Sequence, residues 1–440
     1  MGSIKAVFEP ASVAVYGASR SPSKLGHVLL KNVVEGGFDG EVVAVNPSRE
    51  EVLGLSSVAS LKHAVDLALV SVPAPAVPAA VADAARAGCR AAIVLASGFG
   101  ETGAAGQAVE QELAGVARAA GMRLVGPNCM GVVSRRAAGW LNGSYFWQLP
   151  ATAGGVSMVS QSGAFGGMFF AEARRRGLGV ARFLSVGNSA DVGETDAIEW
   201  LAADPATQVI GLFAEAFRDG RRFVEVVAAC SKPVVVLKAG KEAAGARAAA
   251  SHTGSLAGRH GAVRAAFRRA GVVEAETADD FFDALTVLAG GRPKRVGPSV
   301  AVLTISGGPG VLASDAAERL GLRLPAPGED TVRRLRELAP TFASTGNPVD
   351  LTPQCPPAAF APAIAAVFED PAFDGVVVIN CGLDIPEFGA GVAAAQVRTR
   401  KPVTAFLLEV PQIEAALRDA GIPLLPSPER AVAAYRTLMR

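Results

Sequence analysis

The chain has 440 residues, half of them hydrophobic and 19% charged, and its 42 basic and 41 acidic side chains give a net charge of +1. This length predicts about three domains, and the balanced charge excludes the basic surface of a nucleic-acid-binding protein. No uninterrupted apolar run reaches ~18 residues and no signal-peptide pattern stands at the start, so we expect a cytoplasmic protein without membrane contact. Five scattered cysteines without a CxxC pair predict neither a disulfide framework nor a metal site.

Short β-branched runs alternate with alanine-rich stretches along the chain, which is the pattern of parallel sheets built from βαβ units. In the first part, five runs predict strands and three longer stretches predict helices. The strands are 12–16, 41–46, 67–72, 91–96 and 123–125, and the helices are 25–35, 77–87 and 105–120. We therefore expect a doubly wound domain over residues 1–142.

Two further sets of strands and helices follow the first. The second set has strands 155–159, 181–185, 209–213 and 233–238 and helices 166–176, 196–203, 221–229 and 258–270; the third has strands 300–305, 375–380 and 403–408. Turn residues and charges at 290–294 predict a linker between these two sets. The expected domains are residues 150–290 and 297–440, and the expected fold class is α/β with parallel sheets.

Each set opens with an apolar strand, a turn of small residues and a helix. The three turns are Gly17-Ala18-Ser19, Gln161-Ser162-Gly163 and Ser306-Gly307-Gly308. Such a turn places backbone N–H groups at the positive end of a helix, which is suited to binding an anion. The alternative is that these glycines only permit tight turns. The sequence leaves both interpretations open for any single loop.

The first turn carries features of a site for a phosphorylated ligand. Arg20 and Lys24 add two cations to its backbone N–H groups. About 20 residues later, where a nicotinamide enzyme places an acid for the ribose, this chain has Asn46 and Arg49. That exchange favours a phosphorylated ribose, as in NADP or coenzyme A. The ends of the third and fourth strands, at Val72 and Ser97, are expected at the same sheet edge.

Three residues of the second set are candidates for chemistry. Ser162 either caps a helix or both caps it and binds an anion. His252 is surrounded by small and hydroxyl residues; a lone histidine is usually structural, but an imidazole free to move is also a good nucleophile. Glu215 either accepts the other imidazole N–H or is an exposed loop acid.

Taken together, six ordered motifs resemble those of the NDP-forming acyl-CoA synthetases, relatives of succinyl-CoA synthetase. The motifs are Gly17-Ala18-Ser19-Arg20, Val45-Asn46-Pro47, Gly126-Pro127-Asn128-Cys129, Ser160-Gln161-Ser162-Gly163, Ser251-His252-Thr253-Gly254 and Asn347-Pro348-Val349-Asp350. The similarity covers residues 5–440 and is strongest to α subunits. It implies a CoA-binding Rossmann-like domain followed by two flavodoxin-like domains.

The resemblance also implies a reversible relay in which acyl-CoA and phosphate give an acyl phosphate, whose phosphoryl group passes through a histidine to a nucleoside diphosphate. His252 would be that histidine and Glu215 its support, while Ser162, Gly163, Gly307 and Gly308 would bind phosphate. The implied CoA contacts are Gly17, Ala18, Ser19, Arg20, Ser21, Lys24, Arg49, Val72, Pro73, Ser97, Gly98, Phe99 and Asn128.

Two departures from the family bear on function. No ATP-grasp segment is found among the 440 residues, so we expect a separate ATP-grasp β subunit that binds ATP or ADP with Mg²⁺, and no metal on this chain. Succinyl-specific relatives have an aromatic residue one turn into the helix that follows the second turn, where this chain has Gly166, Gly167 and Met168. The sequence therefore does not identify which carboxylic acid or acyl-CoA is the substrate.

Three alternative functions are consistent with the sequence. They are a non-catalytic CoA- or acyl-CoA-binding protein, a ligase that passes the acyl group to an amine, and a dinucleotide oxidoreductase.

Overall fold

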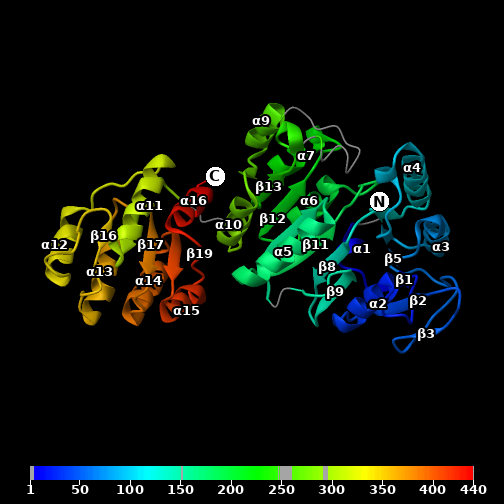
Figure 1. Cartoon of the computed structure of the whole chain (residues 1–440), viewed down its shortest axis with the longest axis horizontal. Coiled ribbons are helices and arrows are strands. Elements are labelled where there is room, and N and C mark those ends of the chain that lie inside the picture. The colour runs from blue at the N-terminus through cyan, green and yellow to red at the C-terminus, as the bar shows by residue number, and fades with distance from the viewer. Residues whose placement is uncertain (1–3, 150–151, 246, 248–259, 291–295, 440) are drawn as a thin grey trace. The chain divides into compact units, whose positions relative to one another are not determined.

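The computed structural model describes residues 4–149, 152–245, 247, 260–290 and 296–439 (Figure 1). It divides into two compact units, Met1–Phe281 and Phe282–Arg440. Unit 1 contains two large sheets and unit 2 contains one, and helices connect the strands of each. The α/β fold class with mostly parallel sheets is therefore confirmed.

The first sheet of unit 1 has five parallel strands in the order β2-β1-β5-β6-β7. Because β1 pairs with β2 on one side and β5 on the other, the strand order reverses beside β1, and doubly wound sheets bind ligands at such a point. The strands are β1 (Ser12–Tyr16), β2 (Glu41–Val45), β5 (Leu67–Val70), β6 (Ala91–Val94) and β7 (Arg123–Val125), and the main helices are α2 (Leu25–Glu35), α3 (Val77–Ala87) and α4 (Ala104–Ala119). Smaller elements are α1 (Lys5–Phe8), β3 (Glu51–Val52), β4 (Leu55–Ser56), η1 (Ala74–Ala76) and η2 (Gly100–Thr102).

The second sheet of unit 1 has seven strands in the order β14-β13-β12-β10-β11-β8-β9. Here the order reverses at β10, which lies between β12 and β11. The strands are β8 (Gly131–Arg135), β9 (Trp140–Ser144), β10 (Ala153–Ser160), β11 (Val180–Ser185), β12 (Val209–Ala214), β13 (Val234–Lys238) and β14 (Val273–Ala275). The helices are α5 (Gly163–Arg176), α6 (Glu194–Ala203), α7 (Gly220–Ala229), α9 (His260–Ala270) and α10 (Ala278–Leu288), of which α10 crosses into unit 2.

The hairpin of β8 and β9 differs from the sequence-based expectation, which predicted no strand there and ended the first domain at residue 142. Residues 132–134 of β8 pair antiparallel with residues 182–184 of β11, so the hairpin extends the second sheet. Its other side contacts α2 of the first sheet, where the Trp140 N–H donates to Gly36 O at 2.8 Å. The hairpin thus links the two sheets, and its Val132 packs in a core cluster that also contains Val15 and Leu69 of the first sheet.

Unit 2 is a doubly wound sheet in the order β16-β15-β17-β18-β19. Helices α11 and α16 contact each other and the sheet, and α12 to α15 form a continuous row (Figure 1). The strands are β15 (Val300–Thr304), β16 (Val349–Asp350), β17 (Gly375–Cys381), β18 (Val403–Leu408) and β19 (Leu424–Leu425). The helices are α11 (Gly307–Arg319), α12 (Glu329–Leu338), α13 (Pro357–Glu369), α14 (Pro386–Thr399), α15 (Pro411–Asp419) and α16 (Pro428–Leu438).

Three properties of the described residues bear on the class of protein. None of their helices is both long and apolar enough to cross a membrane. They contain no group of three or more histidine, cysteine or acidic side chains placed to hold a metal ion. All five cysteines are free thiols.

Candidate functional site

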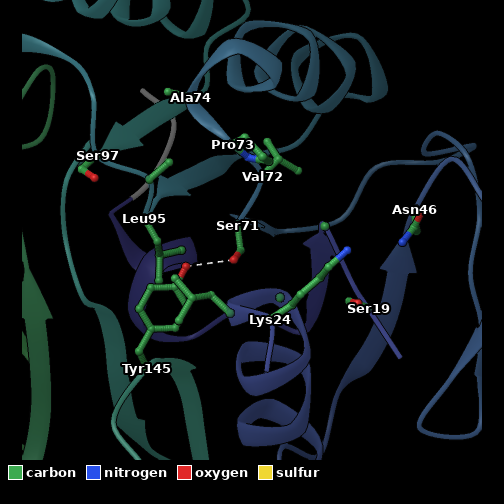
Figure 2. Close-up of a pocket in the computed structure, with 14 residues that line it drawn as sticks. Ser19, Lys24, Asn46, Ser71, Val72, Pro73, Ala74, Leu95, Ser97 and Tyr145 are labelled. Carbon is green, nitrogen blue, oxygen red and sulfur yellow. Dashed lines mark hydrogen bonds between the residues drawn. The ribbon is translucent and has the colours of Figure 1, made fainter. Parts of the chain in front are cut away.

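A cavity of about 620 Å³ lies at the carboxyl edge of the first sheet, where the strand order reverses (Figure 2). Its wall is formed by the residues that follow β1, β2, β5 and β6, by the first turn of α2, and by one tyrosine from beyond β9. The lining residues are Gly17, Ser19, Lys24, Leu25, Gly26, Asn46, Ser71, Val72, Pro73, Ala74, Leu95, Ala96, Ser97 and Tyr145. This is the position at which open α/β sheets bind ligands.

Two glycines allow α2 to begin directly against the loop after β1. Gly17 has φ +87°, and a Cβ there would lie 2.3 Å from Ser71 O. A Cβ on Gly26 would lie 1.9 Å from Gly17 O, so no larger residue fits without backbone movement. This close approach brings the N-terminus of α2 and Lys24 into the cavity wall. Backbone N–H groups, the positive helix end and an ammonium group together form a site suited to phosphate.

Part of the predicted CoA set lines this cavity: Gly17, Ser19, Lys24, Val72, Pro73 and Ser97. The remaining predicted contacts are not in its wall. The Ala18 side chain is fully buried, and its carbonyl accepts from the Asn46 side chain at 2.5 Å. Arg20 is exposed and pairs with Glu50 at 2.8 Å. Phe99 is buried in the core of the first sheet.

Four further predicted CoA residues make local backbone or loop contacts. The Ser21 N–H donates to Ser19 Oγ at 3.2 Å. Arg49 and Asn128 both have positive φ, 55° and 57°, and the Asn128 amide donates to Asn188 Oδ1 at 3.2 Å. Gly98 has φ +106°, and its N–H donates to Glu101 Oε1 at 2.5 Å. These contacts describe turn geometry, and a CoA contact from these residues stays a prediction.

Ser71, Asn46 and Tyr145 line the cavity although none of them is among the predicted CoA contacts. Ser71 and Asn46 directly follow β5 and β2, so the rule that strand ends meet at one sheet edge was sufficient to find them. Tyr145 follows the unpredicted strand β9 and has no such signal. Its hydroxyl lies 2.8 Å from Ser71 Oγ, and burial raises the pKa of Tyr145 to about 12 (Figure 2). The phenol is therefore neutral near pH 7 and provides one hydrogen bond to this wall.

A second cavity of about 300 Å³ shares Tyr145 with the first. It is bordered by one face of α5, by residues after β9 and by Met130; the lining residues are Met130, Tyr145, Phe146, Trp147, Gln148, Gly167, Phe170 and Arg174. A Cβ on Gly163 would lie 2.4 Å from Met130 Cγ, so the first residue of α5 contacts this wall. Tyr145 therefore stands between the two cavities, and Met130 stands between the second cavity and the first residue of α5.

Ser162 is the N-cap of α5, where its Oγ accepts from the Phe165 N–H at 3.3 Å. The Ser162 N–H in turn donates to Ser160 Oγ at 3.2 Å. The predicted cap is confirmed, and it leaves further N–H groups of the first helical turn for another acceptor. Binding of phosphate at Ser162 and Gly163 stays a prediction.

Glu215 lies directly after β12, next to the end of β10 across the second point of strand reversal. Its peptide N–H donates to Gln161 Oε1 at 2.5 Å, so the Glu215 loop and the Ser162 loop are joined. The structure thus brings the predicted acid beside the predicted phosphate turn. The predicted histidine, His252, lies outside the described residues, and its role stays a prediction.

The third predicted turn belongs to unit 2. α11 begins at Gly307, but the Ser306 hydroxyl lies 3.2 Å from Asn380 Oδ1 and accepts from the Cys381 N–H at 3.1 Å instead of capping the helix. A Cβ on Gly307 would lie 3.0 Å from Asp350 Oδ2, whereas Gly308 faces open space. No side chain among the described residues caps the first N–H groups of α11, so they are available to bind another acceptor, and the Asp350 carboxylate lies beside them.

Comparison with known families assigns all three parts of the chain. Residues 11–135 match a family described as CoA binding domain, residues 153–288 match succinyl-CoA ligase like flavodoxin domain, and residues 300–406 match Ligase-CoA domain. The cavity of the first sheet lies within the CoA-binding match, and the Ser162 and Gly307 turns lie within the other two. Fold and site together define a CoA-binding protein of the ligase class.

Individual relatives narrow this class. The chain is 39% identical over 441 residues to acetate–CoA ligase (ADP-forming) I of Archaeoglobus fulgidus, covering 99% of the chain and 63% of that protein. It is 37% identical to acetate–CoA ligase (ADP-forming) II subunit alpha of Pyrococcus furiosus, covering 98% of the chain and 96% of the subunit. The structure of Ca. Korarchaeum cryptofilum acetyl-coenzyme A synthetase 1 with phosphate and ADP matches 100% of the chain and 96% of that chain, with 34% identity and a TM-score of 0.91. The chain belongs to the family of ADP-forming acyl-CoA synthetases, and it matches nearly the full length of the Pyrococcus furiosus alpha subunit but about two thirds of the Archaeoglobus fulgidus protein.

Proposed function

We propose that the chain is the α-type part of a synthetase that interconverts acyl-CoA, phosphate and ADP with a carboxylic acid, CoA and ATP. The second cavity is the observation that carries this proposal. It shares its wall residue Tyr145 with the first cavity, and its wall residue Met130 lies against Gly163 at the N-terminus of α5. A thioester bound in the first cavity and a phosphate at the α5 N-terminus would therefore meet beside it.

The proposed reaction consists of three transfers. A phosphate oxygen attacks the thioester carbonyl and the CoA thiolate leaves, which gives an acyl phosphate. A ring nitrogen of His252 attacks the phosphorus and the carboxylate leaves. A terminal oxygen of ADP then attacks the phosphohistidine, which restores the imidazole and forms ATP. Such transfers depend mainly on positioning and charge stabilisation, to which a helix N-terminus contributes about 0.3–1 kcal/mol.

We place the acyl group in the second cavity, because its walls are mainly aromatic and aliphatic. Its 300 Å³ equals the liquid volume of about ten water molecules, which exceeds what an acetyl group fills. Gly167 keeps the α5 side open, since a Cβ there would meet only Phe146 Cε1, at 3.8 Å. We therefore propose an acid with a larger apolar group as the preferred substrate.

The remaining parts of the proposal concern partner and location. An ATP-grasp β subunit would supply the ADP site and Mg²⁺; the naming of the Pyrococcus furiosus relatives as alpha subunits supports such a partner. Five free cysteines, none paired, fit the reducing cytoplasm, where ATP and CoA are available.

The test is to co-purify the chain with its ATP-grasp partner and to measure ADP release with a panel of carboxylic acids. We expect release that requires both CoA and an acid, with an apolar acid preferred over acetate. Release that needs no CoA but requires an amine would replace this proposal with amide synthesis. CoA binding without ADP release for any acid would contradict catalysis and favour a CoA-binding protein.

A further inference from the structure

The Gln161 side chain fixes the backbone that carries Glu215. Its Oε1 accepts from the N–H groups of Glu215 and Ala216, at 2.5 and 3.0 Å, and its Nε2 donates to Ala216 O at 2.7 Å. The main chain of Gln161 adds a bond from its N–H to Phe213 O at 3.2 Å. One amide side chain therefore satisfies both peptide N–H groups and one carbonyl of this turn. Substitution by an apolar side chain would leave these groups without a partner.

Lys238 binds the carbonyl group of Glu215, whereas Gln161 binds its N–H group. Lys238 is the last residue of β13 and is 7% exposed, and its Nζ donates to Glu215 O at 2.6 Å and also to Ala239 O. Burial lowers the pKa of Lys238, while the Glu215 charge opposes this shift. The charged groups that act on Lys238 are Glu215 at the end of β12 and Lys241 after β13. The N–H and the carbonyl of Glu215 are thus both held by side chains.

The buried Glu194 side chain contacts the Gln161 amide group. Glu194 is the first residue of α6, is 1% exposed, and its Oε2 lies 3.4 Å from Gln161 Nε2. Burial raises the pKa of Glu194. The amide group of Gln161 therefore has partners at both of its polar atoms and a defined orientation, which an exposed glutamine lacks.

We infer that Gln161 and Lys238 are positioning residues that hold Glu215 for the phosphoryl transfer. This inference rests on the proposed function. Glu215 directly follows β12, and Lys238 is the last residue of the adjacent strand β13. A catalytic group must be held within about 0.5 Å of its working position, and a 1 Å error can reduce a rate about 100-fold. Fixing both peptide groups of Glu215 meets that requirement.

The test uses the complex with the ATP-grasp partner and the substitutions Gln161→Leu and Lys238→Met. We expect kcat to fall about 10- to 100-fold in each, with CoA affinity unchanged within about twofold. Lys232→Met is the matched control, because Lys232 is also partly buried and donates to two backbone carbonyls, those of Leu201 and Asp204, away from Glu215. Equal losses of kcat in Lys238→Met and Lys232→Met would overturn the inference, as would wild-type kcat in Gln161→Leu.

The pH dependence of kcat shows whether Lys238 acts through its charged ammonium group or only through packing of its side chain. Because burial lowers its pKa, Lys238 should lose its charge at a lower pH than an ordinary lysine, and wild-type kcat should fall as pH rises through that value. In Lys238→Arg the fall should move to higher pH, since a guanidinium stays protonated. An unmoved profile in Lys238→Arg would contradict the role.

Hydrogen exchange tests the contacts between Gln161 and the Glu215 turn without any assay of activity. The Glu215 and Ala216 N–H groups should exchange at least tenfold faster in Gln161→Leu than in the wild-type chain, whereas Gln111→Leu, at an exposed position of α4, should change nothing. If the wild-type complex releases no ADP with any acid, the proposed function fails while this measurement still decides whether Gln161 holds the turn. Unchanged exchange in Gln161→Leu would overturn the inference.

Discussion

The hydroxyl groups of Tyr145 and Ser71 lie 2.8 Å apart and join two different sheets at one cavity. Ser71 follows β5 of the first sheet, and Tyr145 follows β9 at the edge of the second. Tyr145 also borders the second cavity, so a single side chain separates the space proposed for CoA from the space proposed for the acyl group. A shift of Tyr145 would therefore change both the space proposed for CoA and the space proposed for the acyl group.

Tyr145→Phe should weaken CoA binding about two- to tenfold, because loss of one hydrogen bond costs about 0.5–1.5 kcal/mol. Burial raises the pKa of Tyr145 to about 12, so this hydroxyl stays protonated and wild-type affinity should show no ionisation of Tyr145 between pH 6 and 10. Calorimetric titration with CoA measures both effects. Tyr16→Phe is the control, since Tyr16 donates to Asp83 at 2.9 Å outside the cavity wall; an equal loss of affinity there would contradict a specific role.

Lys24→Met should weaken CoA binding about 10- to 100-fold and reduce its dependence on salt, because hydrogen bonds to charged groups are worth about 1.5–3 kcal/mol. Arg20→Met should have a smaller effect, since Arg20 lies outside the cavity wall, is exposed and pairs with Glu50. Titration at two salt concentrations compares them. If Arg20→Met proved the more damaging change, CoA would bind outside the cavity described above.

Gly26→Ala should destabilise unit 1 and weaken CoA binding, because the added Cβ would lie 1.9 Å from Gly17 O and force the α2 N-terminus away from the cavity. Overpacking of this kind costs about 1–3 kcal/mol. Gly115→Ala within α4 meets no atom within 4 Å and should be neutral or stabilising, since alanine is the better helix former. Thermal unfolding and CoA titration of both variants check the comparison, and equal unfolding midpoints would refute the steric argument.

Gly167→Leu should fill much of the second cavity and shift acid preference toward acetate. We expect kcat/KM for the largest accepted acid to fall at least tenfold, while acetate is affected much less, since overpacking acts only on the group that occupies the space. Met168→Leu, at the neighbouring exposed position, is the control. The same order of preference in wild-type and Gly167→Leu complexes would show that the acyl group binds elsewhere.

Periodicity and glycine turns were sufficient to predict three successive sheets and the edge of the first sheet at which the cavity lies, whereas the six predicted CoA contacts that line it came from the family resemblance. β1, α2 and α3 have the predicted bounds, because strong apolar patterns and clear turn residues define them. The short strands β14, β16 and β19 have two or three residues each and provide too little periodicity to be recognised.

Contacts between distant segments could not be predicted from local patterns. The β8–β9 hairpin is recognisable only through its pairing with β11, about 50 residues later, and Tyr145 reaches the cavity because of that pairing. Phe99 illustrates the opposite case: its motif resembles a ligand contact, but its large apolar side chain is more stable in the core. Arg20 likewise has a carboxylate partner that its position in the sequence does not reveal.

The central claim is that His252 carries the phosphoryl group with the support of Glu215. The direct measurement is to incubate the chain and its ATP-grasp partner with Mg²⁺ and ATP labelled in the γ-phosphate, and to quantify acid-labile, base-stable label on the chain. We expect label on the wild-type chain, less on Glu215→Gln with unchanged CoA affinity, and none on His252→Ala. Undiminished label on His252→Ala would contradict the account.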